Sequence, residues 1–297
     1  MIIAPLIAAA VAAQTPLSPI ARRIDEQRLR LADLRNYSYR IVFPKPEDAV
    51  RYSGKSEYLY SIVSPNGRSL YAIRREFNGR GVPLDTLIRR DLHAAQPGSE
   101  ETVSAPFSNL NQFAVSPNEK FMVIAGRLAE PSVEKDKRDG VFLLDRSTGA
   151  IHTIAPYASL SQDTGSFNVS DAGDRVIYEN NGTVMIFKAV GGRLALTDRH
   201  AGHLPALMPD GRGYIYSDRG QLILNDGKAR RALLSIPNVV GAIRISPDNQ
   251  FLAFGVEPFG NLGSTRLKIC DLNTSVCIDG PMYSEWIAGR ETFWIER

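Results

Sequence analysis

The chain has 297 residues, of which 43% are hydrophobic and 23% charged, and its formal net charge at pH 7 is +3. This composition is typical of a globular protein with a large core, and it excludes a disordered or fibrous chain. The small positive charge, without a stripe of Lys and Arg interleaved with aromatic residues, argues against nucleic acid as a partner.

The first segment, residues 1–13, is a run of apolar and small residues that ends in Ala-Val-Ala-Ala. Such a run predicts a secretory signal peptide. It is too short to cross the roughly 30 Å hydrocarbon layer as a helix, so we expect no transmembrane segment in the mature chain. The first basic residue is Arg22, so the charged region that normally opens a signal is missing, and a buried N-terminal segment is the alternative.

Residues 14–35 predict a linker followed by one short amphipathic helix. Ser18 is a suitable N-cap and Pro19 fits the first helical position. The apolar residues that would share one face are Ile20, Ile24, Leu31 and Leu34. A helix of this kind most often packs on its own domain, and a partner or a membrane surface is the alternative.

From residue 62 onward, a strand-like run, a small polar turn and a second apolar run recur six times. The turns begin at Ser64, Ser116, Ser170, Met208 and Ser246, and a degenerate sixth copy covers residues 286–295. Proline, Asn, Asp and Gly in these turns favour tight connections, so each copy predicts a β-hairpin. Successive turns lie 38 to 54 residues apart, which fits a propeller blade of about 40 to 50 residues.

Three further hairpins fill the intervals, at residues 140–154, 221–234 and 267–278. Each repeat therefore predicts a four-stranded antiparallel sheet, whose strands we label A to D in chain order. We expect an all-β, six-bladed β-propeller over residues 36–297, preceded by the short helix.

The last repeat leaves room for only two strands before Arg297. A β-rich stretch at residues 36–52 could supply the other two, so that the N- and C-terminal segments pair and close the ring. The alternative is a separate hairpin beside an open ring.

The two cysteines, Cys270 and Cys277, lie at the ends of the predicted hairpin 267–278. Facing positions on paired strands bring Cβ atoms within disulfide range, and an exported protein would form this bond. Two buried free thiols are the alternative.

The turn sequences carry a resemblance to a known family. Ser64–Gly67, Ser116–Glu119, Met208–Gly211 and Ser246–Asn249, each followed by an apolar run, resemble the Ser-Pro-Asp-Gly repeat of TolB-type β-propellers. The resemblance covers about residues 53–297 and implies a periplasmic module that binds a protein or peptide at the mouth of its channel. TolB also has an N-terminal α/β domain, which we do not expect in this chain.

The sequence contains no nucleophile elbow, Walker loop, dinucleotide fingerprint or His-Glu-x-x-His motif. We therefore expect a non-enzymatic, monomeric protein without a cofactor. A metal-dependent propeller enzyme, such as a lactonase-like hydrolase or a polysaccharide lyase, is the alternative. In that case His200 and His203, with Asp163 or Glu285, are the candidate ligands.

The binding hypothesis uses the connections from strand D of one blade to strand A of the next. These connections are expected to ring one face with polar and aromatic groups that could bind a peptide. The candidate binding residues are Asn111, Gln112, Gln162, Asp163, Arg199, His200, His203, Arg244, Tyr283 and Glu285.

Overall fold

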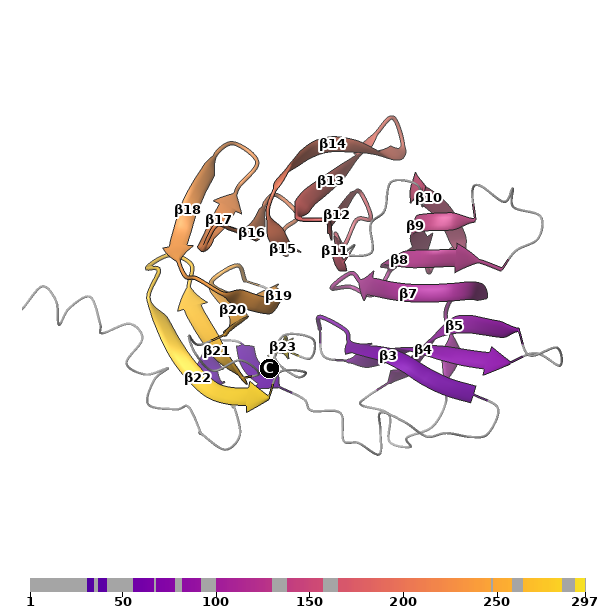
Figure 1. Ribbon diagram of the computed structural model, residues 1–297, viewed down its shortest axis with the longest axis horizontal. Coiled ribbons are helices and arrows are strands. Elements are labelled where there is room, and N and C mark those ends of the chain that lie inside the picture. Colours follow the sequence, from indigo (N-terminus) through magenta and orange to yellow (C-terminus); the bar gives the residue numbers. More distant parts are fainter. Residues whose placement is uncertain are drawn as a thin grey trace, which may run out of the picture.

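A computed structural model describes residues 31–34, 37–41, 56–66, 68–77, 82–91, 100–129, 138–156, 165–246, 248–257, 264–284 and 292–296. These residues form 23 β-strands, and none of them is helical (Figure 1). All pairings between the strands are antiparallel. The predicted all-β class with several antiparallel sheets is confirmed.

Three sheets have the predicted four strands in simple chain order. The third blade contains β11 (Gly165–Val169), β12 (Arg175–Asn180), β13 (Thr183–Val190) and β14 (Arg193–Ala201). The fourth contains β15 (His203–Leu207), β16 (Tyr214–Asp218), β17 (Gln221–Asn225) and β18 (Arg230–Ser235). The fifth contains β19 (Val239–Ile245), β20 (Phe251–Val256), β21 (Ser264–Asp271) and β22 (Cys277–Ser284).

The first two blades depart from this plan because they are joined into one eight-stranded sheet. The first blade contains β3 (Ser56–Val63), β4 (Ser69–Phe77), β5 (Pro83–Asp91) and β6 (Glu101–Thr102). The second contains β7 (Phe107–Val115), β8 (Phe121–Leu128), β9 (Asp139–Asp145) and β10 (Ala150–Pro156). Since β6 is only two residues long, it leaves part of β5 uncovered, and β5 pairs with β7 at Asp85 and Phe107.

Strands from the two ends of the chain also pair with each other. β2 (Tyr37–Ile41) lies between β1 (Leu31–Leu34) and β23 (Thr292–Glu296) in a three-stranded sheet. Tyr37 pairs with Glu296 and Ile41 with Thr292. The predicted helix is wrong at its end, because residues 31–34 are in β1 and bond to β2 instead. The rest of that helix and the predicted signal peptide lie outside the described residues.

In the third to fifth blades the A strands lie toward the middle of the molecule and the D strands lie at the rim, and β7 of the second blade points toward the middle with its C-terminal end (Figure 1). β7 contacts β11, β11 contacts β15, and β15 contacts β19. Because the strands alternate in direction, the A–B and C–D turns share one face, which we call the AB face. The D–A connections and the B–C turns share the opposite face, which we call the DA face.

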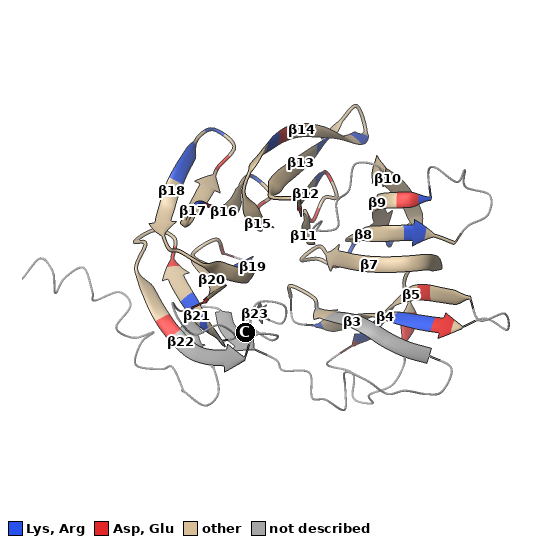
Figure 2. Cartoon of the chain, in the orientation of Figure 1, with Lys and Arg blue, Asp and Glu red and all other residues tan. Residues whose placement is uncertain are grey.

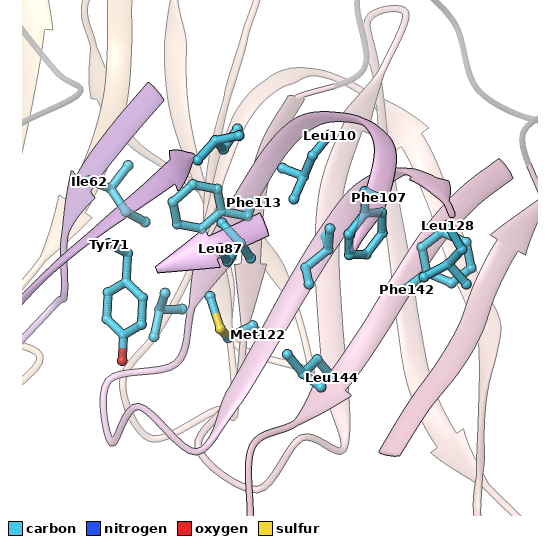
Figure 3. Close-up of a cluster of buried hydrophobic side chains, with 13 residues drawn as sticks. Ile62, Tyr71, Leu87, Phe107, Leu110, Phe113, Met122, Leu128, Phe142 and Leu144 are labelled. Carbon is cyan, nitrogen blue, oxygen red and sulfur yellow. The ribbon is translucent and has the colours of Figure 1, made fainter. Parts of the chain in front are cut away.

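Apolar side chains fill the spaces between neighbouring blades. The cluster between the first and second blades includes Tyr71, Leu87, Phe107, Met122 and Phe142, all nearly inaccessible to solvent (Figure 3). Similar clusters join the second blade to the third and the fourth to the fifth. The burial of this apolar surface contributes about 25 cal/mol of stabilisation for each Å² and is the main interaction that holds the blades together.

The serine that opens most of the A–B turns is buried and serves as a local cap. The Ser246 hydroxyl donates to Asp248 at 2.6 Å and accepts from the backbone N–H of Phe251 at 2.9 Å. Ser116 makes the same pair of bonds with Asn118 and Phe121. The hydroxyl thus satisfies the first N–H of strand B, which explains why serine recurs at this position.

The Ser246→Ala variant should have a free energy of unfolding about 1 to 3 kcal/mol lower than that of the wild type. The reason is that the buried N–H of Phe251 loses its side-chain acceptor. Urea denaturation measures this change. Ser147→Ala is the matched control, since Ser147 also bonds an aspartate but is exposed. Equal stability of the two variants would contradict this role for the serine.

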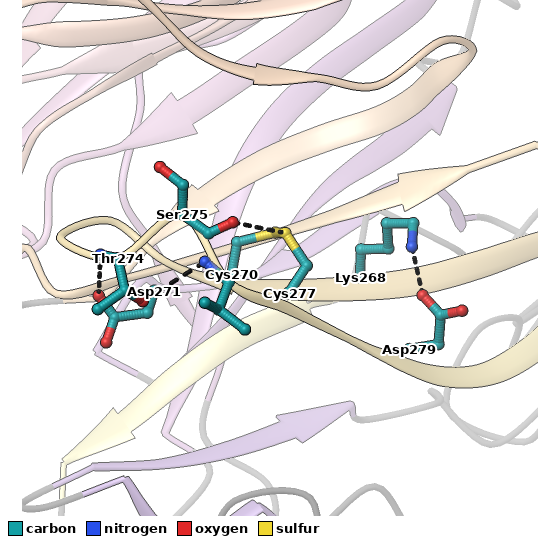
Figure 4. The surroundings of a disulfide bond; sticks show 8 residues. Lys268, Cys270, Asp271, Thr274, Ser275, Cys277 and Asp279 are labelled. Carbon is teal, nitrogen blue, oxygen red and sulfur yellow. Dashed lines mark hydrogen bonds and ion pairs between the residues drawn. A yellow bond between two sulfur atoms is a disulfide. The ribbon is translucent and has the colours of Figure 1, made fainter. Parts of the chain in front are cut away.

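Cys270 and Cys277 form the predicted disulfide between β21 and the rim strand β22 (Figure 4). The two residues face each other directly in the hairpin, with their Cα atoms 4.0 Å apart. The turn that joins them is also held by Asp271, whose carboxylate accepts from the N–H groups of Asn273 and Thr274. The disulfide therefore fastens the rim of the fifth blade.

Candidate functional site

The candidate site is the DA face, where the innermost strands begin. Each A strand of the second to fifth blades departs from regular pairing with its B strand. The irregularities fall at Leu110/Gln112 in β7, Gly165/Asn168 in β11, His203/Ala206 in β15 and Val240/Arg244 in β19. Such bulges bend a strand and re-aim its side chains, and they often occur beside functional sites.

The crossover from the third blade to the fourth has a constrained backbone at Gly202 and Leu204. Gly202 leaves no room for a side chain, because an added Cβ would lie 2.5 Å from the Tyr216 ring. Leu204 has a φ of 52°, in the left-handed region that costs a branched residue about 1 to 2 kcal/mol. Its N–H donates to Glu179 Oε2 at 2.9 Å, which helps to hold this conformation.

The same carboxylate orients His203. Nδ1 of His203 lies 2.7 Å from Glu179 Oε1, and because an ionised carboxylate only accepts, Nδ1 donates. The Glu179 side chain is only 14% exposed, whereas that of His203 is 60% exposed. Glu179 thus holds an imidazole at the surface in one orientation, with Nε2 directed away from the carboxylate.

Contacts between neighbouring A strands stiffen this face. The Asn168 amide in β11 donates to the carbonyl of Pro205 in β15 at 2.8 Å. In the second blade, the Gln112 side chain lies against Gly165, the first residue of β11. The polar groups of the face therefore sit on a frame that is cross-linked from blade to blade.

His200 does not belong to the open face. Its ring stacks on Tyr214 with 5.7 Å between the centroids, and its Nε2 lies 2.9 Å from the Tyr214 hydroxyl. It also packs on Tyr216, with 4.3 Å between centroids. Burial lowers the pKa of His200, which favours a neutral imidazole. Burial likewise raises the pKa of Tyr214 to about 12.

The remaining predicted residues are placed within strands rather than on connections. Asn111 is exposed and Gln112 half-buried in β7, and Arg244 is half-buried in β19. Arg199 is exposed on the rim strand β14, whose neighbouring residue Asp198 pairs with Arg230. The backbone of Tyr283 is in β22. Gln162, Asp163 and Glu285 lie outside the described residues.

The structure therefore brings only part of the predicted set together. Asn111, Gln112 and His203 lie on the innermost strands near the DA face. Arg244 is the last residue but one of β19 and lies toward the AB face, next to the turn at Ser246. His200 and Arg199 belong to the outer part of the third blade. The prediction that D–A connections carry these residues is wrong for the described ones, because the structure places all of them in strands. Asn111 and Gln112 lie within β7, Arg199 and His200 lie in β14, and His203 begins β15.

Glu179 and Asn168, the two residues that shape the crossover, are not among the predicted candidates. Glu179 lies near the end of β12, just before the Asn181-Gly182 turn, and both of its partners follow more than 20 residues later. A polar residue at the end of a buried strand is a weak signal, because most such residues are solvated. Only the folded arrangement identifies their role.

The metal hypothesis finds no geometric support in the part of the chain that the structure describes. No three His, Cys, Asp or Glu side chains there come close enough to hold an ion. His200 is engaged by Tyr214 and His203 by Glu179. The described residues also contain no helix of the length and hydrophobicity that crossing a bilayer requires.

Neither a protein-family model nor a curated protein matches the sequence. Solved structures do match. TolB of Acinetobacter baumannii aligns with a TM-score of 0.53 and 16% identity, over 81% of this chain and 57% of that chain. A putative TolB of Agrobacterium tumefaciens has a TM-score of 0.52 and 16% identity, over 81% and 89% of the two chains.

An oligogalacturonate lyase of Vibrio parahaemolyticus has a TM-score of 0.50 and 11% identity, over 80% of this chain and 74% of that chain. The chain thus spans less than two thirds of the Acinetobacter TolB, and all three identities are low enough to inform on fold alone. The chain has a β-propeller fold like that of TolB.

Proposed function

We propose that this chain is a periplasmic, non-enzymatic six-bladed propeller that binds a protein or peptide partner on its DA face. In this proposal, β1, β2 and β23 belong to the sixth blade, which the two ends of the chain complete together. The antiparallel pairing of β2 with β23 and the contact of β23 with β19 support this closure.

The observation that carries the binding proposal is the rigid polar frame at the innermost strands. Asn111 and His203 present exposed amide and imidazole groups, and Glu179 fixes the orientation of the imidazole. Preorganised groups lose less entropy on binding than mobile ones, so such a face is well suited to recognise a partner. The TolB-type turn sequences imply the same class of function.

The proposed location rests on the disulfide and the fold likeness. Cys270 and Cys277 are bonded, and stable disulfides are typical of oxidising compartments such as the periplasm. The predicted signal peptide at residues 1–13 agrees with export.

Site-specific photo-crosslinking tests the proposed face. A photo-reactive phenylalanine analogue is placed at Asn111 on the DA side and, as a control, at Lys120 in an exposed A–B turn of the same blade. In cells that export the protein, we expect a discrete higher-mass adduct from position 111 and none from position 120. An adduct from position 120 alone, or equal adducts from both, would refute binding on the DA face.

The competing enzyme hypothesis has a separate test. Elemental analysis of the purified mature protein would have to show a stoichiometric Ca²⁺, Zn²⁺ or Mn²⁺ that is lost in the His203→Ala variant. We expect no stoichiometric metal ion in either protein.

A further inference from the structure

The turn between β7 and β8 contains an unusual residue at a position that is otherwise taken by Gly or Asn. In the matching turns of three other blades, Gly173, Gly211 and Asn249 have φ values of 67°, 68° and 58°. Glu119 occupies the same position with a φ of 61°. This left-handed conformation disfavours residues other than Gly, Asn and Asp, so Glu119 adds local strain that its repeats avoid.

The Glu119 side chain reaches from this turn into the junction between the first and second blades. Its Oε2 atom accepts from the Ser69 hydroxyl at 2.9 Å, the Tyr71 hydroxyl at 2.8 Å and Nε of Arg89 at 3.1 Å. Ser69 and Tyr71 lie in β4, and Arg89 lies in β5. One carboxylate of the second blade thus receives three donors from two strands of the first.

Arg146, in the turn between β9 and β10, closes the cluster from the other side. Its NH1 group donates to the backbone carbonyl of Glu119 at 2.8 Å and to the Tyr71 hydroxyl at 2.9 Å. Its NH2 group also pairs with Glu101 of β6 at 3.3 Å. Every strand of the first blade except β3 is therefore connected to the AB side of the second blade.

Burial makes this arrangement costly unless the charge is compensated. The Glu119 side chain is only 9% exposed, and Asp85 and Glu119 are the two acidic residues buried among the described residues. Burial alone would raise the pKa of Glu119, but donors from Tyr71, Ser64, Ser69 and Arg89 outweigh it, and the pKa lies below its usual range. The carboxylate is therefore charged at neutral pH.

Buried charge clusters often contribute more to structural specificity than to net stability. In a propeller, the blades present similar apolar faces, so apolar contact alone distinguishes poorly between partners. Both buried carboxylates, Asp85 and Glu119, lie in the one junction where the first blade has a two-residue outer strand.

We propose that Glu119 is a latch, a residue whose side chain fixes the first blade on the second. It occupies a turn position otherwise suited to glycine because its carboxylate is required in the junction between the two blades. This role is independent of the partner-binding face, since Glu119 lies on the AB side. Failure of the crosslinking test above would leave it intact.

The Glu119→Gly variant tests the latch against the turn preference. If Glu119 is only a turn residue, glycine relieves strain and stabilises the protein. If it is a latch, thermal unfolding shifts down by about 5 °C or more, because three donors lose a buried acceptor. Asn249→Gly is the matched control, and we expect its midpoint to move by no more than about 1 °C.

A second variant covers the case in which Glu119→Gly does not fold. Glu119→Gln keeps the side-chain size and removes the charge. In this variant, amides of β4 and β5 should exchange hydrogen at least about tenfold faster than in the wild type. Exchange of amides in β16 and β17 should be unchanged. A midpoint for Glu119→Gly at or above the wild-type value, or exchange in Glu119→Gln that is unchanged or equally faster in all strands, would overturn the proposal.

Discussion

The Asp85→Ala variant is expected to lose about 3 to 5 kcal/mol of unfolding free energy, because it removes a fully buried carboxylate that joins two blades. Asp85 is 0% exposed and forms a two-pronged ion pair with Arg75, with distances of 2.7 and 2.9 Å. Its Oδ2 atom also accepts from the backbone N–H of Leu110 in β7, at 2.9 Å. The variant leaves that N–H buried without its acceptor and takes a buried partner away from Arg75.

The second blade supplies a matched control for this prediction. Arg127 and Asp139 pair across β8 and β9 as Arg75 and Asp85 pair across β4 and β5, again with two short contacts. Basic and acidic segments are visible on these neighbouring strands in Figure 2. Arg127 is 58% exposed, however, and solvent screens its attraction to Asp139. Asp139→Ala should therefore cost less than about 1 kcal/mol.

Urea denaturation of both variants, with an unchanged dependence on urea concentration, gives the two free energies. A difference of less than about 1 kcal/mol between Asp85→Ala and Asp139→Ala would show that the bond to Leu110 and the burial add little. A loss confined to Asp85→Ala would confirm that the blade junction, and not the ion pair as such, sets the cost.

Local chemistry explains why the hairpins could be predicted from the sequence. The turn at Ser246 forms because the Ser246 hydroxyl and the Asp248 carboxylate accept hydrogen bonds from backbone N–H groups within six residues. The disulfide could be predicted for the same reason, since Cys270 and Cys277 face each other within one hairpin. These features depend on contacts between residues that are close in sequence.

The errors concern contacts that are distant in sequence. Leu31 and Leu34 have a spacing that suits a helix face, but hydrogen bonds to β2 decide their conformation. The union of the first two blades depends on the length of β6, which no turn motif reveals. Tertiary structure overrides local preference in both cases.

The candidate site was predictable in its general position and not in its construction. Asn111, Gln112 and His203 were identified because they precede or begin innermost strands. The roles of Glu179 and Glu119 were not, because a single carboxylate in the sequence has no visible partner. His200 was assigned to the open face since its tyrosine partners lie in the next blade, at Tyr214 and Tyr216.

A pair of cysteines introduced at Ser38 and Ile295 should form a disulfide and raise the unfolding free energy by about 5 kcal/mol, according to the loop-entropy model. These residues are direct partners in the pairing of β2 with β23, so the new bond would join the two ends of the chain. The large effect follows from the length of the loop that it closes in the unfolded state.

The register of the pairing provides the control. Cysteines at Ser38 and Trp294 are offset by one residue, and because successive side chains of a strand point to opposite faces, this pair should remain reduced. Non-reducing mass spectrometry of the peptides and urea denaturation with and without reductant distinguish the two variants. Oxidation of neither pair would contradict a closed ring, and equal oxidation of both would contradict the register. Oxidation of the in-register pair alone would show that β2 and β23 pair in solution.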